Sequence, residues 1–105
     1  HRFFAELPAG LLRAYDMYYH DPYAIALVPV TQKELPHKCI CLVDEQSASR
    51  VRSLSDLMEL CADLKRRMKP KEKEALCFFD FRFQDRIISR IIPRSEFEQL
   101  QRVDG

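Results

Sequence analysis

The sequence predicts a single small α+β domain in which helices pack on a mainly antiparallel sheet of about four strands. Apolar residues recur with a helical period after residue 53, which indicates one amphipathic helix with a buried face. Short runs rich in β-branched and aromatic residues occur in pairs on either side of it. Two strand pairs separated by one helix are most simply joined in one sheet with the helices packed on it.

The first half of the chain predicts a helix followed by a hairpin. Pro8 suits a first helical turn, and an apolar and aromatic stripe at helical spacing follows it as far as Tyr19. Residues 23–30 and 37–45 are two apolar runs that predict a pair of strands joined by a loop.

The second half predicts a helix, a second hairpin and a final helix. Ser53 is placed to cap the central helix, with Asp56 at its third position. The run ALCFFDFRF, from residue 75, predicts a strand. Residues 86–92 fit a strand or a helix, and their β-branched density with the following Pro favours the strand. Ser95 and Glu98 match a capping box that opens a short last helix, so the predicted order is α-β-β-α-β-β-α.

Composition narrows the class of protein. The 105 residues fit one domain, 1–105, and because the chain starts with His rather than Met we expect a fragment of a larger protein. A net charge of +1 with abundant large apolar residues argues against a disordered chain. No apolar stretch reaches the roughly 20 residues of a membrane span, and no signal peptide is visible, so no membrane partner is expected.

The cysteines predict a reducing compartment. Cys39 and Cys41 alternate on one strand, Cys61 falls on the apolar face of the central helix, and Cys77 lies in an apolar strand. Such positions are typical of reduced core thiols rather than of a disulfide framework, which predicts an intracellular protein, cytoplasmic or nuclear.

The sequence contains little that indicates a metal site or a catalytic site. His37, Cys39 and Cys41 share one strand face, but their spacing is not that of a structural zinc site, and no fourth ligand has a motif. The sequence contains no phosphate-binding glycine loop and no nucleophile or metalloprotease motif. We therefore expect no metal, no cofactor, no small-molecule ligand and no enzyme activity.

The segment KRRMKPKEKEALCFFDFRF, residues 65–83, places cations next to alternating Phe residues. In a strand Cys77, Phe79, Phe81 and Phe83 share one face without a charge, which predicts core rather than a base-stacking platform. The cations suit the C-terminal end of a helix dipole. They also leave open a nuclear-import signal or contacts with nucleic-acid phosphates. The residues of this alternative RNA- or DNA-binding surface are Arg50, Arg52, Lys65, Arg66, Arg67, Lys69 and Lys71.

The leading functional hypothesis is a non-catalytic protein-interaction module, an adaptor or dimerisation domain that binds another protein or itself. The N-terminal segment is unusually aromatic, and a helix can bury only one stripe of it. The expected partner-binding residues are Phe3, Phe4, Tyr15, Met17, Tyr18 and Tyr19. A second expected surface is an exposed strand edge, at residues 23–30 or 86–92, open to strand addition.

Overall fold

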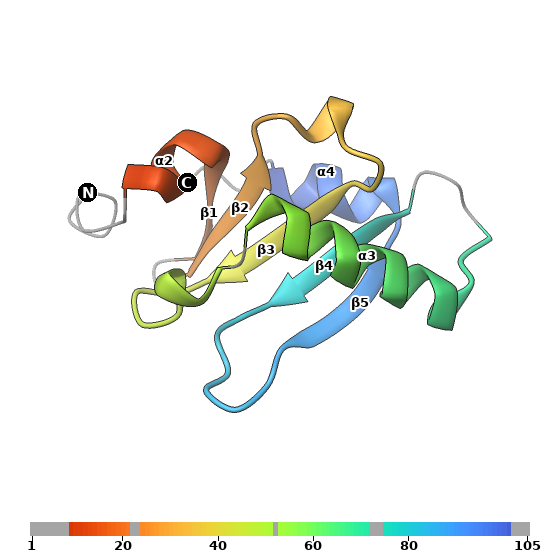
Figure 1. Ribbon diagram of the computed structural model, residues 1–105. Coiled ribbons are helices and arrows are strands. Elements are labelled where there is room, and N and C mark those ends of the chain that lie inside the picture. Colours follow the sequence, from red (N-terminus) through yellow and green to blue (C-terminus); the bar gives the residue numbers. More distant parts are fainter. Residues whose placement is uncertain (1–8, 22–23, 52, 72–74, 102–105) are drawn as a thin grey trace.

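A five-stranded mixed sheet with helices on both of its faces forms the fold of the computed structural model (Figure 1). The structure describes residues 9–21, 24–51, 53–71 and 75–101. In chain order its elements are α2 (Ala9–Ala14), β1 (Tyr15–Asp21), β2 (Ala24–Pro29), the 3-10 turn η1 (Gln32–Glu34), β3 (Cys39–Val43), the 3-10 turn η2 (Ala48–Arg50), α3 (Leu54–Met68), β4 (Leu76–Asp80), β5 (Ile88–Ile92) and α4 (Arg94–Gln101).

The strands lie in the order β1-β2-β3-β4-β5. The pairs β1–β2, β2–β3 and β4–β5 are antiparallel, whereas β3 and β4 are parallel, with Cys39 opposite Cys77. A parallel pair needs a long crossover connection, and α3 supplies it. The predicted α+β class and both predicted hairpins are therefore confirmed. The fifth strand and the parallel central pair were not predicted.

The first predicted helix is wrong beyond Ala14, where the chain becomes strand β1. Tyr15, Tyr18 and Tyr19 fit a helical spacing, yet the segment YDMYYHD is rich in aromatic residues that favour strands. Pairing with β2 satisfies the backbone groups on one side of β1, and the amide of Val30 extends the ladder by donating to the carbonyl of Ala14 at 3.0 Å. Tertiary pairing thus overrides the local helical pattern.

Helix α3 begins as predicted. The Ser53 hydroxyl accepts a hydrogen bond from the Asp56 amide at 3.2 Å, which caps the first turn. The helix ends at Met68, and its C-cap residue Lys69 adopts a left-handed conformation with φ of 46°. Helix α4 starts at Arg94, so Ser95 lies inside the helix instead of capping it. The amides of Glu96 and Phe97 donate to the carbonyl of Pro93.

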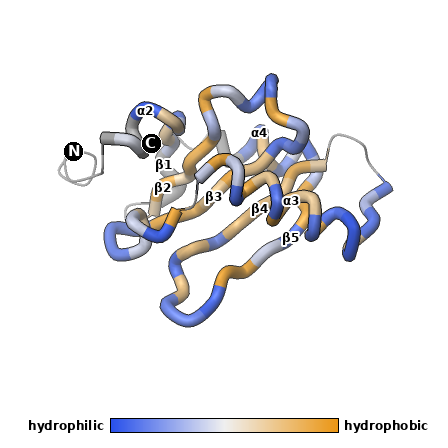
Figure 2. Tube along the Cα trace, in the orientation of Figure 1, coloured by the Kyte–Doolittle hydropathy of each residue, from blue (hydrophilic) through white to orange (hydrophobic). Residues whose placement is uncertain are grey.

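The sheet buries both of its faces, because α3 covers one and α4 packs on the other (Figure 1). Odd-numbered residues of β2, β3 and β4 face α3, and even-numbered residues face α4. The central strands are accordingly apolar along their length, whereas the last turn of α3 is hydrophilic (Figure 2).

The Phe-rich strand belongs to the core, as predicted. Phe79 and Phe81 are 1% and 2% exposed beneath α3, and only Phe83, beyond the end of β4, reaches the surface at 38%. Segment 88–92 is a strand, the alternative that its β-branched residues favoured. Within the residues that the structure describes, no helix is long and apolar enough to cross a membrane.

Candidate functional site

A groove of about 540 Å³ lies at one end of the sheet, between α4 and the loop that joins β2 to β3. We call it the α4 groove. Its apolar lining comes from four elements and includes Tyr18 of β1, Val28 of β2, Leu76 of β4 and Phe97 of α4. Its volume lies within the roughly 300–1,000 Å³ of typical ligand pockets. The groove therefore has room for a large side chain or a small molecule.

The loop wall of the groove is held in place by the side chain of Gln32. Its Nε2 donates to the carbonyl of Cys39 at 2.8 Å, and its Oε1 accepts from the amide of Cys39 at 3.2 Å. The amide group thus pairs with the first residue of β3 as a neighbouring strand would. These two hydrogen bonds to the backbone of Cys39 fix the loop wall before any ligand binds.

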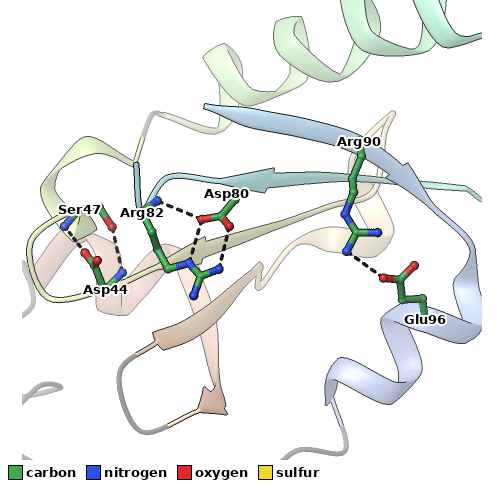
Figure 3. A network of polar contacts seen from close by, with 6 residues as sticks. All are labelled: Asp44, Ser47, Asp80, Arg82, Arg90 and Glu96. Atoms are coloured by element: carbon green, nitrogen blue, oxygen red, sulfur yellow. Dashed lines mark hydrogen bonds and ion pairs between the residues drawn. The ribbon is translucent and has the colours of Figure 1, made fainter. Parts of the chain in front are cut away.

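The opposite wall, α4, is held on the sheet by Arg90 of β5. The Arg90 guanidinium lies 4.6 Å from the centre of the Phe78 ring. It also lies 2.8 Å from a carboxylate oxygen of Glu96 (Figure 3). On α4 itself, Arg94 pairs with Glu98 at 3.2 Å. The groove therefore lies between two walls that are each fixed by polar contacts.

Charges of both signs stand on the rim of the groove. Asp16 and Glu34 supply the anions, and Lys33 and Lys38 the cations. All four lining side chains are free of ion pairs to other residues that the structure describes. The rim can accordingly pair with a ligand that carries both charges.

The sheet separates the predicted partner-binding residues. Tyr15 is buried at 4% exposure in the core beneath α3, so it forms no part of an exposed surface. Met17 packs against that same core, whereas Tyr18 lies on the other face and lines the α4 groove. Phe3 and Phe4, and the side chain of Tyr19, lie outside what the structure describes. Among the expected partner-binding residues whose side chains the structure describes, Tyr18 alone lines the groove.

The predicted nucleic-acid residues form two separate groups. Arg50 precedes α3 and donates to the carbonyl of Phe83 at 2.8 Å, and Arg52 lies outside the described residues. The second group lies at the other end of α3, about 22 Å away at 1.5 Å per residue, and consists of Lys65, Arg66, Arg67, Lys69 and Lys71. Arg66 and Arg67 both bind Asp63, yet their side chains are 76% and 64% exposed.

All four cysteines are free and buried between β3, β4 and α3. A hydrogen bond with Cys39, together with burial, raises the pKa of Cys61 to about 12. A hydrogen bond with Cys61 and burial also raise the pKa of Cys77, and burial raises that of Cys41. Because thiolates are the nucleophiles and metal ligands, these thiols behave as apolar core groups.

His37 does not extend the thiol group into a metal site. Burial and the nearby charge of Lys65 lower its pKa. Among the residues that the structure describes, no group of three or more His, Cys, Asp or Glu side chains is arranged to hold a metal ion.

A buried polar contact was missed by the sequence reasoning. Asp80 is 6% exposed at the end of β4, and Arg82 binds both of its oxygens at 3.0 and 2.9 Å (Figure 3). In the turn after β3, Asp44 and Ser47 exchange side chain-to-backbone bonds at 2.9 and 2.8 Å. Strand alternation placed Asp80 on the side of β4 away from Phe79 and Phe81. The structure shows that this second side of the strand is also buried. These contacts stabilise turns and lie outside the α4 groove.

Comparisons with protein-family models, with curated proteins and with solved structures returned no match to this chain.

Proposed function

We propose that this chain is a non-catalytic protein-interaction module of a larger intracellular protein. In this proposal the α4 groove binds a short segment of another protein that inserts one large apolar side chain. The supporting observation is the composition of the groove. It combines an apolar and aromatic floor from Tyr18, Val28, Leu76 and Phe97 with rim charges of both signs, of which Asp16, Glu34, Lys33 and Lys38 form no ion pair to another described residue.

The groove has the same arrangement of apolar centre and charged rim as a larger protein-interaction surface. Interfaces combine an apolar centre, often aromatic, with a polar rim that fixes orientation. A peptide segment supplies an apolar anchor, and its flanking side chains can pair with Lys33 and Lys38 on one side and with Asp16 and Glu34 on the other. The groove lining contains no Cys, Ser or His among the described residues.

The test is selection from a library of random twelve-residue peptides displayed on phage, followed by anisotropy measurements with the selected peptides. Val30 is 50% exposed and lines the groove, whereas Met68 is 58% exposed at the end of α3. We expect Val30→Glu to weaken binding about tenfold or more, because it places a charge against an apolar anchor. The matched control Met68→Glu should bind within about twofold of the unchanged chain.

Tyr18→Ala provides a second check, because it removes an aromatic group from the floor while the fold is monitored by circular dichroism. Weakened binding in a folded variant is the expected result. The proposal fails if the library yields no enriched peptide. It also fails if the selected peptides bind the Val30→Glu and Tyr18→Ala variants as tightly as the unchanged chain.

A second candidate function, binding of RNA or DNA, rests on the exposure of Arg66 and Arg67 beside Lys69 and Lys71. We expect such binding to weaken with salt, with a log–log slope of roughly −3 to −5 for a handful of phosphate contacts. Labelled single-stranded RNA and duplex DNA, titrated across a salt series, measure this slope. The Arg66→Glu/Arg67→Glu variant should lose this salt-dependent binding. If neither nucleic acid binds at low salt, this candidate is excluded, and the basic side chains only form a solvated end of α3.

A further inference from the structure

Strand β5 forms an open edge of the sheet. It pairs with β4 on one side, and no strand within the described residues pairs with the other. The sequence offered two candidate edges, and the structure separates them. Segment 23–30 contains β2, which is an interior strand, whereas segment 86–92 contains the edge strand β5.

The outer edge of β5 lacks the usual protection against pairing. Edge strands are commonly blunted by Pro, Lys or a bulge. The β4–β5 register is regular over all five pairs, and the strand ISRII contains neither Pro nor Lys. The opposite edge strand, β1, has a register shift between Tyr19 and Asp21.

The one charge within β5 is turned back onto its own domain. The Arg90 guanidinium lies over the Phe78 ring. It also binds Glu96 at 2.8 Å (Figure 3). The charge of Arg90 is thereby neutralised on the α4 face. It hinders the pairing of another strand with β5 less than a free cation would. The neighbouring side chains on β5 are uncharged, with Ile88 38% exposed and Ser89 exposed.

We propose that this edge binds a second copy of the chain, by antiparallel β5–β5 pairing about a two-fold axis at Ser89. Two β5 strands in one continuous sheet must have a residue facing itself on the axis, because opposed side chains point to the same face. An axis at Arg90 would place two guanidinium groups directly opposite each other, which is destabilising. An axis at Ser89 avoids that contact.

The register centred on Ser89 is complementary in its side chains. It places Ile87 opposite Ile91 of the second copy twice on the α3 face, where both residues already pack against the core. On the other face it places Ile88 opposite the aliphatic stem of Arg90 of the second copy. Apolar and β-branched pairs of this kind stabilise neighbouring strands.

The proposed dimer is weak and depends on concentration. A pairing over about five residues covers less than the roughly 800 Å² per partner of a standard interface, so we expect a Kd in the range of about 10–500 μM. This surface lies outside the α4 groove, and the two proposals can therefore fail independently.

The first experiment is a cross-link with the variant Ser89→Cys. A residue on the axis faces its own copy within the Cα distance of a disulfide, roughly 4.4–6.8 Å. Oxidised glutathione takes up the two electrons and two protons that the thiols release. The native cysteines are buried, so they should not react. Ser55→Cys, at an exposed position on α3, is the matched control and should remain monomeric.

The second experiment uses charges on the axis. Sedimentation equilibrium up to 500 μM, the top of the expected range of about 10–500 μM, should show a monomer–dimer equilibrium for the unchanged chain. Ser89→Lys and Ser89→Glu should each be monomeric, because like charges meet on the axis, and an equimolar mixture of the two should form dimers again. The proposal is overturned if the unchanged chain stays monomeric, if either variant alone still dimerises, or if Ser89→Cys cross-links no better than Ser55→Cys.

Discussion

Raising the pH above about 9 is expected to lower the free energy of unfolding of this domain steeply, by about 4 kcal/mol for each further pH unit. The cause is the set of buried thiols of Cys41, Cys61 and Cys77. Burial raises the pKa of Cys41, and a hydrogen bond together with burial raises the pKa values of Cys61 and Cys77. Each thiol contributes about 1.4 kcal/mol for each pH unit, and three thiols give the sum.

The direction follows from proton binding in the two states. The unfolded chain loses its thiol protons near pH 8.5, about the ordinary value, while the folded chain keeps them to a higher pH. The stabilisation is therefore complete below the unfolded pKa and is lost as the pH rises toward the folded pKa. A domain with a total stability of about 5–15 kcal/mol should unfold between about pH 10 and 12.

The measurement is denaturant unfolding followed by circular dichroism between pH 8 and 10.5, with a reductant present. The variant Cys41→Ala removes one buried thiol, so its slope against pH should be lower by about 1.4 kcal/mol for each pH unit. A free energy of unfolding that stays constant over this pH range would contradict the burial of neutral thiols beneath α3.

Tyr15→Ala is expected to cost about 3–5 kcal/mol of stability, the usual effect of truncating a large aromatic residue in a core. Tyr15 is 4% exposed, at the start of β1, and burial raises the pKa of its hydroxyl. In a domain of this size the loss corresponds to a fall in Tm of more than about 12 °C. A Tyr15→Ala variant with unchanged stability would contradict the burial of this side chain beneath α3.

Tyr18→Ala is the matched comparison, because it removes the same side chain from the same strand on the other face. Tyr18 is only partly buried, so we expect a loss of about 1–2 kcal/mol. Thermal and denaturant unfolding of the two variants measure the difference. Equal losses would mean that Tyr15 does not occupy the core as the structure places it.

The candidate site was only partly visible in the sequence. Tyr18 was among the expected partner-binding residues, but the helical spacing grouped it with Tyr15 and Met17. Strand alternation instead places those two on the α3 face and Tyr18 on the α4 face. Gln32 gave no signal at all, because its role depends on the backbone of Cys39, a residue of the next strand.

The sequence by itself determined the elements whose burial pattern repeats locally. The period of α3, its Ser53 cap and the alternation of Phe79 and Phe81 each report one buried face, and each was predicted correctly. Only the tertiary structure decided the fate of Tyr15, the parallel pairing of β3 with β4, and the convergence of four elements on the α4 groove. Those features depend on which distant backbone groups pair, and a strand's hydrogen bonds, unlike a helix's, are made with partners that local spacing does not specify.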